Sequence, residues 1–103
     1  MDRIERINEM LKQNPTDSFL LFALGLEKIK LGNEDEALQL FQSITLSNPD
    51  YSGVYYHLGK LLERKNETEK AIEVYESGMK ICKKLNEQHN YNELRGALDL
   101  LIY

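Results

Sequence analysis

Apolar side chains recur every three or four residues along almost the whole chain, which is the spacing of one face of an α-helix. In the first segment, Ile4, Ile7 and Leu11 follow this spacing. The pattern predicts an all-α fold with about six helices. We place them near residues 2–13, 17–31, from the turn at Asn33 to Ser47, 52–65, 68–84 and 90–102.

Residues that stop helices separate these segments. Proline disfavours the helical conformation in the residue before it, so Asn14-Pro15 and Asn48-Pro49 are each expected to end a helix. Gly32 and Asn66 tolerate the left-handed conformation that closes a helix, and each stands after one of the predicted segments. Residues 86–89 are read as the turn before the last helix.

Capping residues mark the expected helix starts. Thr16 or Asp17 can cap the second helix with a side-chain oxygen. Asn33 is followed three residues later by Glu36, which predicts a capping box at the start of the third helix.

The chain repeats itself at a spacing of 34 residues. Asn14-Pro15 recurs as Asn48-Pro49, and Leu24-Gly25 recurs as Leu58-Gly59. A period of this length indicates stacked helical units, each too small to bury its own apolar face. Such an array is suited to holding another molecule.

The spaced residues resemble those of the tetratricopeptide repeat. The resemblance implies antiparallel helix hairpins stacked into a right-handed superhelix, in a single domain covering 1–103. The repeats would lie at 18–51 and 52–85, after a half repeat or N-terminal helix at 2–15 and before a C-terminal capping helix at 90–102. The residues that carry the resemblance are Leu21, Leu24-Gly25, Gly32, Ala37, Phe41, Pro49, Tyr55, Leu58-Gly59, Ala71 and Tyr75.

Gly25 and Gly59 lie inside predicted helices, where glycine costs about 0.5–1 kcal/mol relative to alanine. A recurring glycine at such a position suggests that another backbone comes close. Ala37 and Ala71 are then expected to be the small partners across each helix pair. Larger side chains would fill the wider gaps, namely Leu21, Phe41, Tyr55 and Tyr75.

In a tetratricopeptide array the first helix of each pair lines a concave groove, so the resemblance implies a partner-binding site. Its first half would be apolar and its second half charged. The implied groove residues are Phe19, Phe22, Leu26, Ile29 and Lys30, followed by Tyr56, Lys60, Glu63 and Arg64.

The segment 19–26 is apolar almost all round, and a helix of this kind is normally covered on every face. Neighbouring helices can cover it within the monomer. Alternatively, it accepts a partner's helix or extended segment, or the same surface of a second copy. Lys60 and Arg64 share a helix face that could hold a carboxylate, but the adjacent Glu63 favours a solvated face of mixed charge.

Composition argues against several other functions. The formal net charge of −4, with signs interspersed, lacks the basic stripe of a nucleic-acid-binding protein. No apolar run approaches the roughly 20 residues that span a bilayer, so no membrane association and a cytoplasmic location are expected. His57, His89 and Cys82 lie on three different elements without nucleophile or metal spacing. We therefore expect no enzymatic activity, no cofactor and no metal site.

The sequence thus predicts a non-catalytic adaptor that binds a protein or peptide partner in a partly apolar groove. The alternative is a homo-oligomeric module, such as a homodimer, whose groove holds its own C-terminal helix or a second copy. The alternative rests on the apolar end of the chain, which contains Leu98, Leu100, Leu101, Ile102 and Tyr103.

Overall fold

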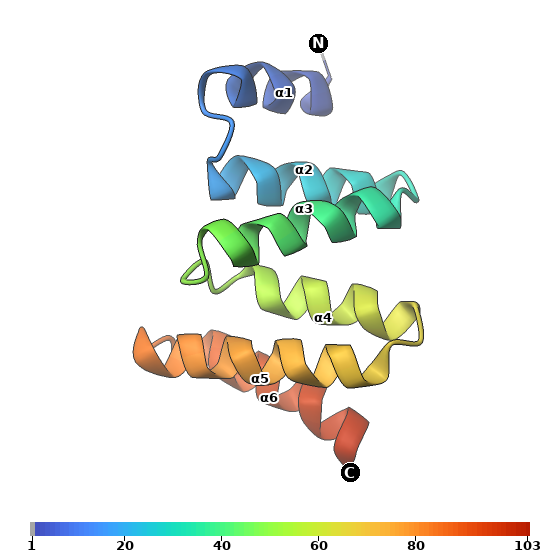
Figure 1. The fold of residues 1–103 in the computed structure, drawn as a ribbon, viewed down its shortest axis with the longest axis vertical. Coiled ribbons are helices and arrows are strands. Elements are labelled where there is room, and N and C mark those ends of the chain that lie inside the picture. The colour runs from blue at the N-terminus through green and yellow to red at the C-terminus, as the bar shows by residue number, and fades with distance from the viewer. Residues whose placement is uncertain (1) are drawn as a thin grey trace. The chain divides into compact units, whose positions relative to one another are not determined.

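The computed structural model describes residues 2–103, and these residues form six α-helices and no strand (Figure 1). This confirms the predicted all-α fold and the number of helices. The helices are α1 (Arg3–Gln13), α2 (Ser18–Lys30), α3 (Glu34–Ser47), α4 (Val54–Arg64), α5 (Thr68–Lys84) and α6 (Gln88–Ile102).

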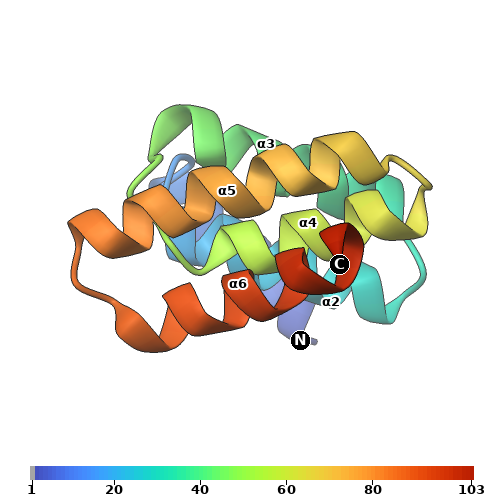
Figure 2. The ribbon, with the colours of Figure 1, turned by 90° about the horizontal axis from the view of Figure 1, so that it is seen from below.

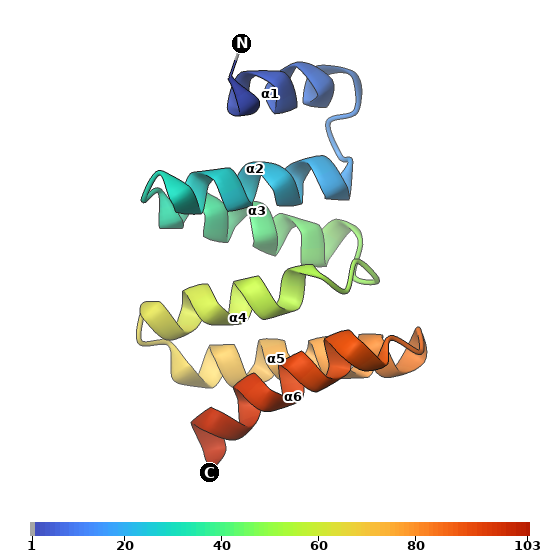
Figure 3. The same ribbon diagram turned by 180° about the vertical axis from the view of Figure 1, so that it is seen from behind.

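The chain divides into two compact units, the first ending at Asn48 and the second covering Pro49–Tyr103. In the first unit, α2 packs against both α1 and α3. In the second unit, α5 packs against both α4 and α6, and α6 also touches α4 (Figures 2 and 3). The assignment of residues 1–103 to a single domain stays a prediction.

Local signals explain most helix ends. The Asp17 carboxylate accepts a hydrogen bond from the backbone N–H of Leu20 at 3.0 Å and caps α2, as expected for one of the two proposed residues. Gly32 and Asn66 take the left-handed conformation, with φ of 81° and 61°, after α2 and α4. These turns are as predicted.

Two expectations about helix starts are wrong. The Asn33 side chain makes no capping hydrogen bond, and Glu36 instead pairs with Lys28 at 2.8 Å. The expected turn at residues 86–89 is shorter, because α6 already begins at Gln88. Asn86 takes a left-handed φ of 58° in this turn, and tolerance of this conformation by asparagine makes the short turn feasible.

The cores are built from the predicted apolar faces. In the first unit Ile7 joins Leu20, Ala23 and Leu24 in one buried cluster between α1 and α2. The largest fully buried side chains of the chain include Phe41 in α3 and Tyr75 in α5. These two rings occupy positions separated by the 34-residue period.

The recurring glycines make room for these rings. A Cβ added to Gly25 would overlap the ring of Phe41, and one added to Gly59 would overlap the ring of Tyr75. The expectation of a close backbone was therefore wrong, because the nearest atoms belong to aromatic side chains. Ala37 and Ala71 are fully buried, but they are not the residues nearest to the two glycines.

Candidate functional site

A stripe of apolar side chains along α2 remains accessible to solvent. Phe22, Leu26 and Ile29 are half-buried, whereas Phe19 at the start of the stripe is 64% exposed. Most other apolar side chains of α2 are buried. The structure therefore brings the four apolar groove residues predicted in this unit onto one face of one helix.

A residue of α3 packs against the stripe. The Phe22 ring lies 5.6 Å from the Phe41 ring, centroid to centroid, at an interplanar angle of 35°. Phe41 in turn packs on Gly25 of α2. Because Phe41 is fully buried, the position of Phe22 depends on the helix pair and not on loops.

Lys30, the basic residue predicted in the same half of the groove, is paired with a carboxylate. Its ammonium lies 3.1 Å from Glu27, and Glu27 also contacts Arg3 of α1 at 3.0 Å. The Glu27 side chain is only 11% exposed. Glu27 therefore ties α1 to the C-terminal end of α2 through two basic partners.

Phe19 borders a hollow of about 520 Å³ between α1 and α2. Met10 of α1 lines the same hollow and is 48% exposed. The hollow extends the apolar stripe toward α1. Its remaining lining residues are Glu9, Gln13, Asn14, Asp17 and Leu20.

In the second unit, three of the four predicted groove residues, Tyr56, Lys60 and Glu63, form a connected polar group on α4. The Lys60 ammonium lies 5.5 Å from the centroid of the Tyr56 ring and 3.6 Å from Glu63. Glu63 also accepts a hydrogen bond from the hydroxyl of Tyr75. Arg64 is exposed. Lys60 thus has two partners within its own unit, which is the mixed-charge arrangement favoured above.

The hydrogen bond to Glu63 satisfies a hydroxyl in the core. Burial and the neighbouring Glu63 carboxylate raise the pKa of Tyr75 above its ordinary value. In the 34-residue period, Phe41 is equivalent to Tyr75, and Ile29 is equivalent to Glu63. Tyr75, which has a hydroxyl, therefore has the Glu63 carboxylate as its partner. Phe41 has no hydroxyl, and Ile29 stands at the position equivalent to Glu63.

The hydrogen bond between Tyr75 and Glu63 and the ion pair between Glu27 and Arg3 were not predicted from the sequence. Tyr75 was assigned only a packing role, although its difference from Phe41 accompanies the difference between Glu63 and Ile29. Such joint changes between the two repeats are the signal that could have identified the contact. For Glu27 the signal is a single acidic residue following a helix segment that is apolar almost all round.

The residues considered for chemistry are used in packing or on the surface. Burial lowers the pKa of the half-buried His57, and Glu93 partly offsets this effect. His89 is exposed and lies 3.7 Å from Glu93. Cys82 is buried, and this burial is the main cause that raises the pKa of its thiol. The nearby Glu87 carboxylate raises the same pKa further. Within residues 2–103, no group of three His, Cys, Asp or Glu side chains is placed to hold a metal ion.

None of the helices in the described part of the chain combines the length and apolarity required to cross a membrane.

Comparisons with known proteins find helical repeat proteins that are similar to this chain in sequence and structure. A family model described as the tetratricopeptide repeat matches residues 52–85. The crystal structure of a tetratricopeptide repeat domain protein from Salinibacter ruber is 39% identical, with a TM-score of 0.80, and the alignment covers 82% of this chain and 94% of that one. A search of curated proteins finds no match.

Two further solved structures are similar over almost the whole chain. A Bordetella parapertussis protein is 27% identical, with a TM-score of 0.82, and the alignment covers 99% of this chain and 89% of that one. The MamA protein is 24% identical, with a TM-score of 0.72, and the alignment covers 96% of this chain but 56% of that one. The likeness to MamA concerns the fold alone.

Proposed function

The chain belongs to the tetratricopeptide repeat family, whose fold generally mediates interactions between proteins, and from this premise we propose that it is a non-catalytic protein-interaction adaptor. We propose two repeats, at 18–51 and 52–85, flanked by the half repeat at 2–15 and the cap at 90–102 in one domain. We also propose a cytoplasmic location, which agrees with a single cysteine that cannot form an internal disulfide.

The observation that carries this proposal is the accessible apolar stripe on α2. Phe22, Leu26 and Ile29 keep part of their surface in water, although most other apolar side chains of α2 are buried. Apolar side chains spaced along one helix face suit the apolar face of a partner's helix or an extended apolar segment. Phe19 and the adjoining hollow of about 520 Å³ would receive a terminal anchor of that partner.

The polar group on α4 contributes specificity in this proposal. Lys60 and Glu63 already interact with each other, at 3.6 Å, so a partner's charge must compete with an existing pair. Lys60 and Glu63 are both half-buried, and a partner that pairs with either side chain must first break their existing contact, so we expect this group to add little affinity. We therefore assign the main anchoring to α2.

The experiment is selection of displayed random peptides on the immobilised full chain. One class of the peptides that bind the wild type should lose binding to Phe22→Glu and to Phe19→Glu, because a carboxylate in the stripe would be buried without a partner. Phe19 is exposed, so Phe19→Glu tests the surface even if Phe22→Glu weakens the fold. Thermal melts establish that each variant is folded.

Leu46→Glu is the matched control, since Leu46 lies on α3 and is 86% exposed. It makes the same change of charge at an apolar residue outside the stripe, and it should leave binding unchanged. The proposal is wrong if no peptide is enriched, or if no class of enriched peptides binds Phe19→Glu more weakly than Leu46→Glu.

A homo-oligomeric module is the second candidate. It is favoured by the C-terminal end of α6, where Leu100 is 79% and Tyr103 is 95% exposed. Sedimentation velocity across a wide concentration range distinguishes the two functions. A dimer that dissociates in Leu100→Glu supports this candidate, whereas a monomer throughout excludes it.

A further inference from the structure

A second surface that could hold a partner lies between α5 and α6, within the second unit. It consists of two neighbouring hollows of about 490 and 370 Å³, which share Lys83 and Tyr91. We refer to the two hollows together as the terminal trough. It involves none of the residues of the α2 stripe.

The smaller hollow of the terminal trough has an apolar floor. Met79 contributes from α5, and Tyr91 and Leu98 contribute from α6. Met79 and Tyr91 are half-buried, and Leu98 is 7% exposed. Antiparallel helices that enclose an apolar floor form the kind of groove in which an amphipathic helix lays its apolar face.

Two lysines on the rim are unusual for this chain. Neither Lys80 nor Lys83 has a carboxylate partner within residues 2–103, although both lie beside the same hollow. Six other lysines each lie within 4.0 Å of a carboxylate; these are Lys12, Lys28, Lys30, Lys60, Lys70 and Lys84.

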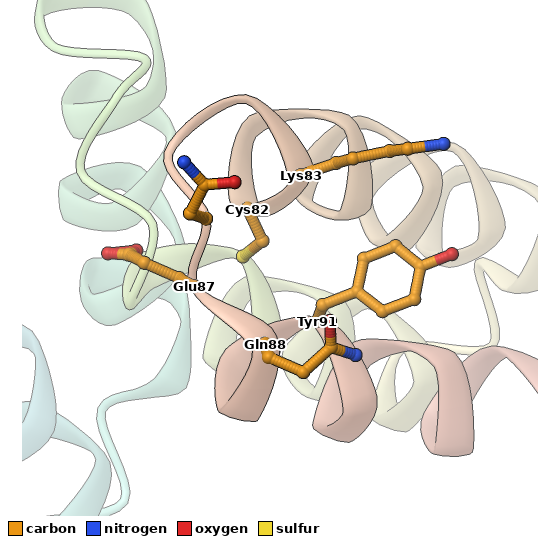
Figure 4. Close-up of a pocket in the computed structure, with 6 residues that line it drawn as sticks. Cys82, Lys83, Glu87, Gln88 and Tyr91 are labelled. Atoms are coloured by element: carbon orange, nitrogen blue, oxygen red, sulfur yellow. The ribbon is translucent and has the colours of Figure 1, made fainter.

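The acidic residues around the trough do not neutralise these lysines. Glu87 accepts hydrogen bonds from the Ser52 hydroxyl at 2.9 and 2.5 Å. Figure 4 shows its carboxylate pointing away from Lys83 and Tyr91, which project toward the same side. Glu76 also lines the trough, but it forms no ion pair with Lys80 in the described part of the chain.

We propose that the terminal trough is a docking surface for an acidic amphipathic segment of a partner protein. Its apolar side chains would rest on Met79, Tyr91 and Leu98, and its carboxylates would pair with Lys80 and Lys83. The two lysines are three residues apart on α5 and so share a helix face. Charge complementarity therefore selects an acidic partner over a basic one.

The same displayed library tests this surface. A class of enriched peptides should combine acidic residues with apolar residues at helical spacing, and it should bind Lys80→Glu/Lys83→Glu at least about tenfold more weakly than the wild type. Binding by this class should also weaken as the salt concentration rises, because the pairs are exposed. Tyr91→Ala should weaken the same peptides through the apolar floor.

Lys12→Glu/Lys70→Glu is the matched control, because it makes the same change in net charge at two exposed lysines outside the trough. This variant should retain the acidic class, as should Phe22→Glu. Loss of binding in Phe22→Glu alone would assign the peptides to the α2 stripe. The two surfaces can therefore fail separately.

The proposal is overturned if no enriched peptide distinguishes the trough variant from its control, or if the peptides that do so are basic. It is also overturned if sedimentation velocity shows a wild-type dimer that Lys80→Glu/Lys83→Glu dissociates. The occupant would then be a second copy of this chain.

Discussion

Replacing Gly59 by alanine should destabilise the protein, although alanine is the better helix former. The added Cβ would overlap the ring of Tyr75, whose Cζ atom lies 2.5 Å from the position of that Cβ. Tyr75 cannot easily move away, because it is fully buried and its hydroxyl is bound to Glu63. The substitution therefore overpacks the contact between α4 and α5.

Gly96→Ala provides an internal reference. Gly96 lies within α6 and is exposed, and a Cβ at this position would meet nothing within 4 Å. This substitution should therefore show only the helix-propensity gain, which is about 0.5–1 kcal/mol. It should raise the melting temperature.

The two effects can be compared in size. Overpacking a core costs about 1–3 kcal/mol, from which the same propensity gain of about 0.5–1 kcal/mol is subtracted at Gly59. For a domain near 100 residues, about 1 kcal/mol shifts the melting temperature by roughly 4–8 °C. The melting temperatures of Gly59→Ala and Gly96→Ala should therefore differ by at least about 5 °C.

Thermal unfolding followed by circular dichroism measures this difference, and urea unfolding provides the free energies. Gly25→Ala should fall between the other two variants, because Phe41 has no hydroxyl to anchor its ring. A melting temperature of Gly59→Ala at or above that of the wild type would refute the ring-on-glycine account. So would a loss of stability in Gly96→Ala.

Three further outcomes are expected. Tyr75→Phe should lower the free energy of unfolding by about 1–2 kcal/mol in urea titrations, because Glu63 loses the hydrogen bond from the Tyr75 hydroxyl. Adding Glu63→Ile to this variant should recover part of the lost free energy. No recovery would argue against the pairing of Tyr75 with Glu63. The folded state raises the pKa of Tyr75, so the unfolded chain ionises first above the ordinary tyrosine pKa of about 10. Stability present below that pH should therefore fall as the pH rises, more steeply in the wild type than in Tyr75→Phe, and equal slopes would contradict this. Glu27→Gln should cost about 1 kcal/mol through lost ion pairs to Arg3 and Lys30, with a smaller cost in high salt; thermal melts at two salt concentrations check this.

The helices could be predicted because their signals are local. Asn14-Pro15 and Asn48-Pro49 follow the ends of α1 and α3, and Gly32 and Asn66 close α2 and α4 with positive φ angles. Each of these signals acts within a few residues and depends on backbone conformation alone. The 34-residue period then related one helix pair to the next.

Contacts between helices were predicted less well. The position of Gly25 pointed to a close approach, but its sequence neighbours do not reveal whether a backbone or the Phe41 ring fills the space. The link between Glu63 and Tyr75 spans 12 residues and depends on how α4 and α5 cross. The predicted capping box at Asn33 does not form, and Glu36 instead pairs with Lys28 across the helix pair.

The candidate site shows the same division. The resemblance implied that Phe22, Leu26 and Ile29 share one helix face, and α2 carries all three. The terminal trough was not foreseen, because it depends on Asn86 turning the chain so that α6 returns along α5. Spacing along one helix could not reveal that Lys80 and Lys83 would border an apolar floor formed by α6.

Chemical-shift mapping tests the central claim most directly. A peptide selected on the wild type, and lost in Phe19→Glu, is titrated into the isotopically labelled full chain. The account predicts that the largest amide shifts fall in α2, at and around Phe22, Leu26 and Ile29. Shifts confined to the outer face of α3 around Leu46, with α2 unmoved, would contradict it.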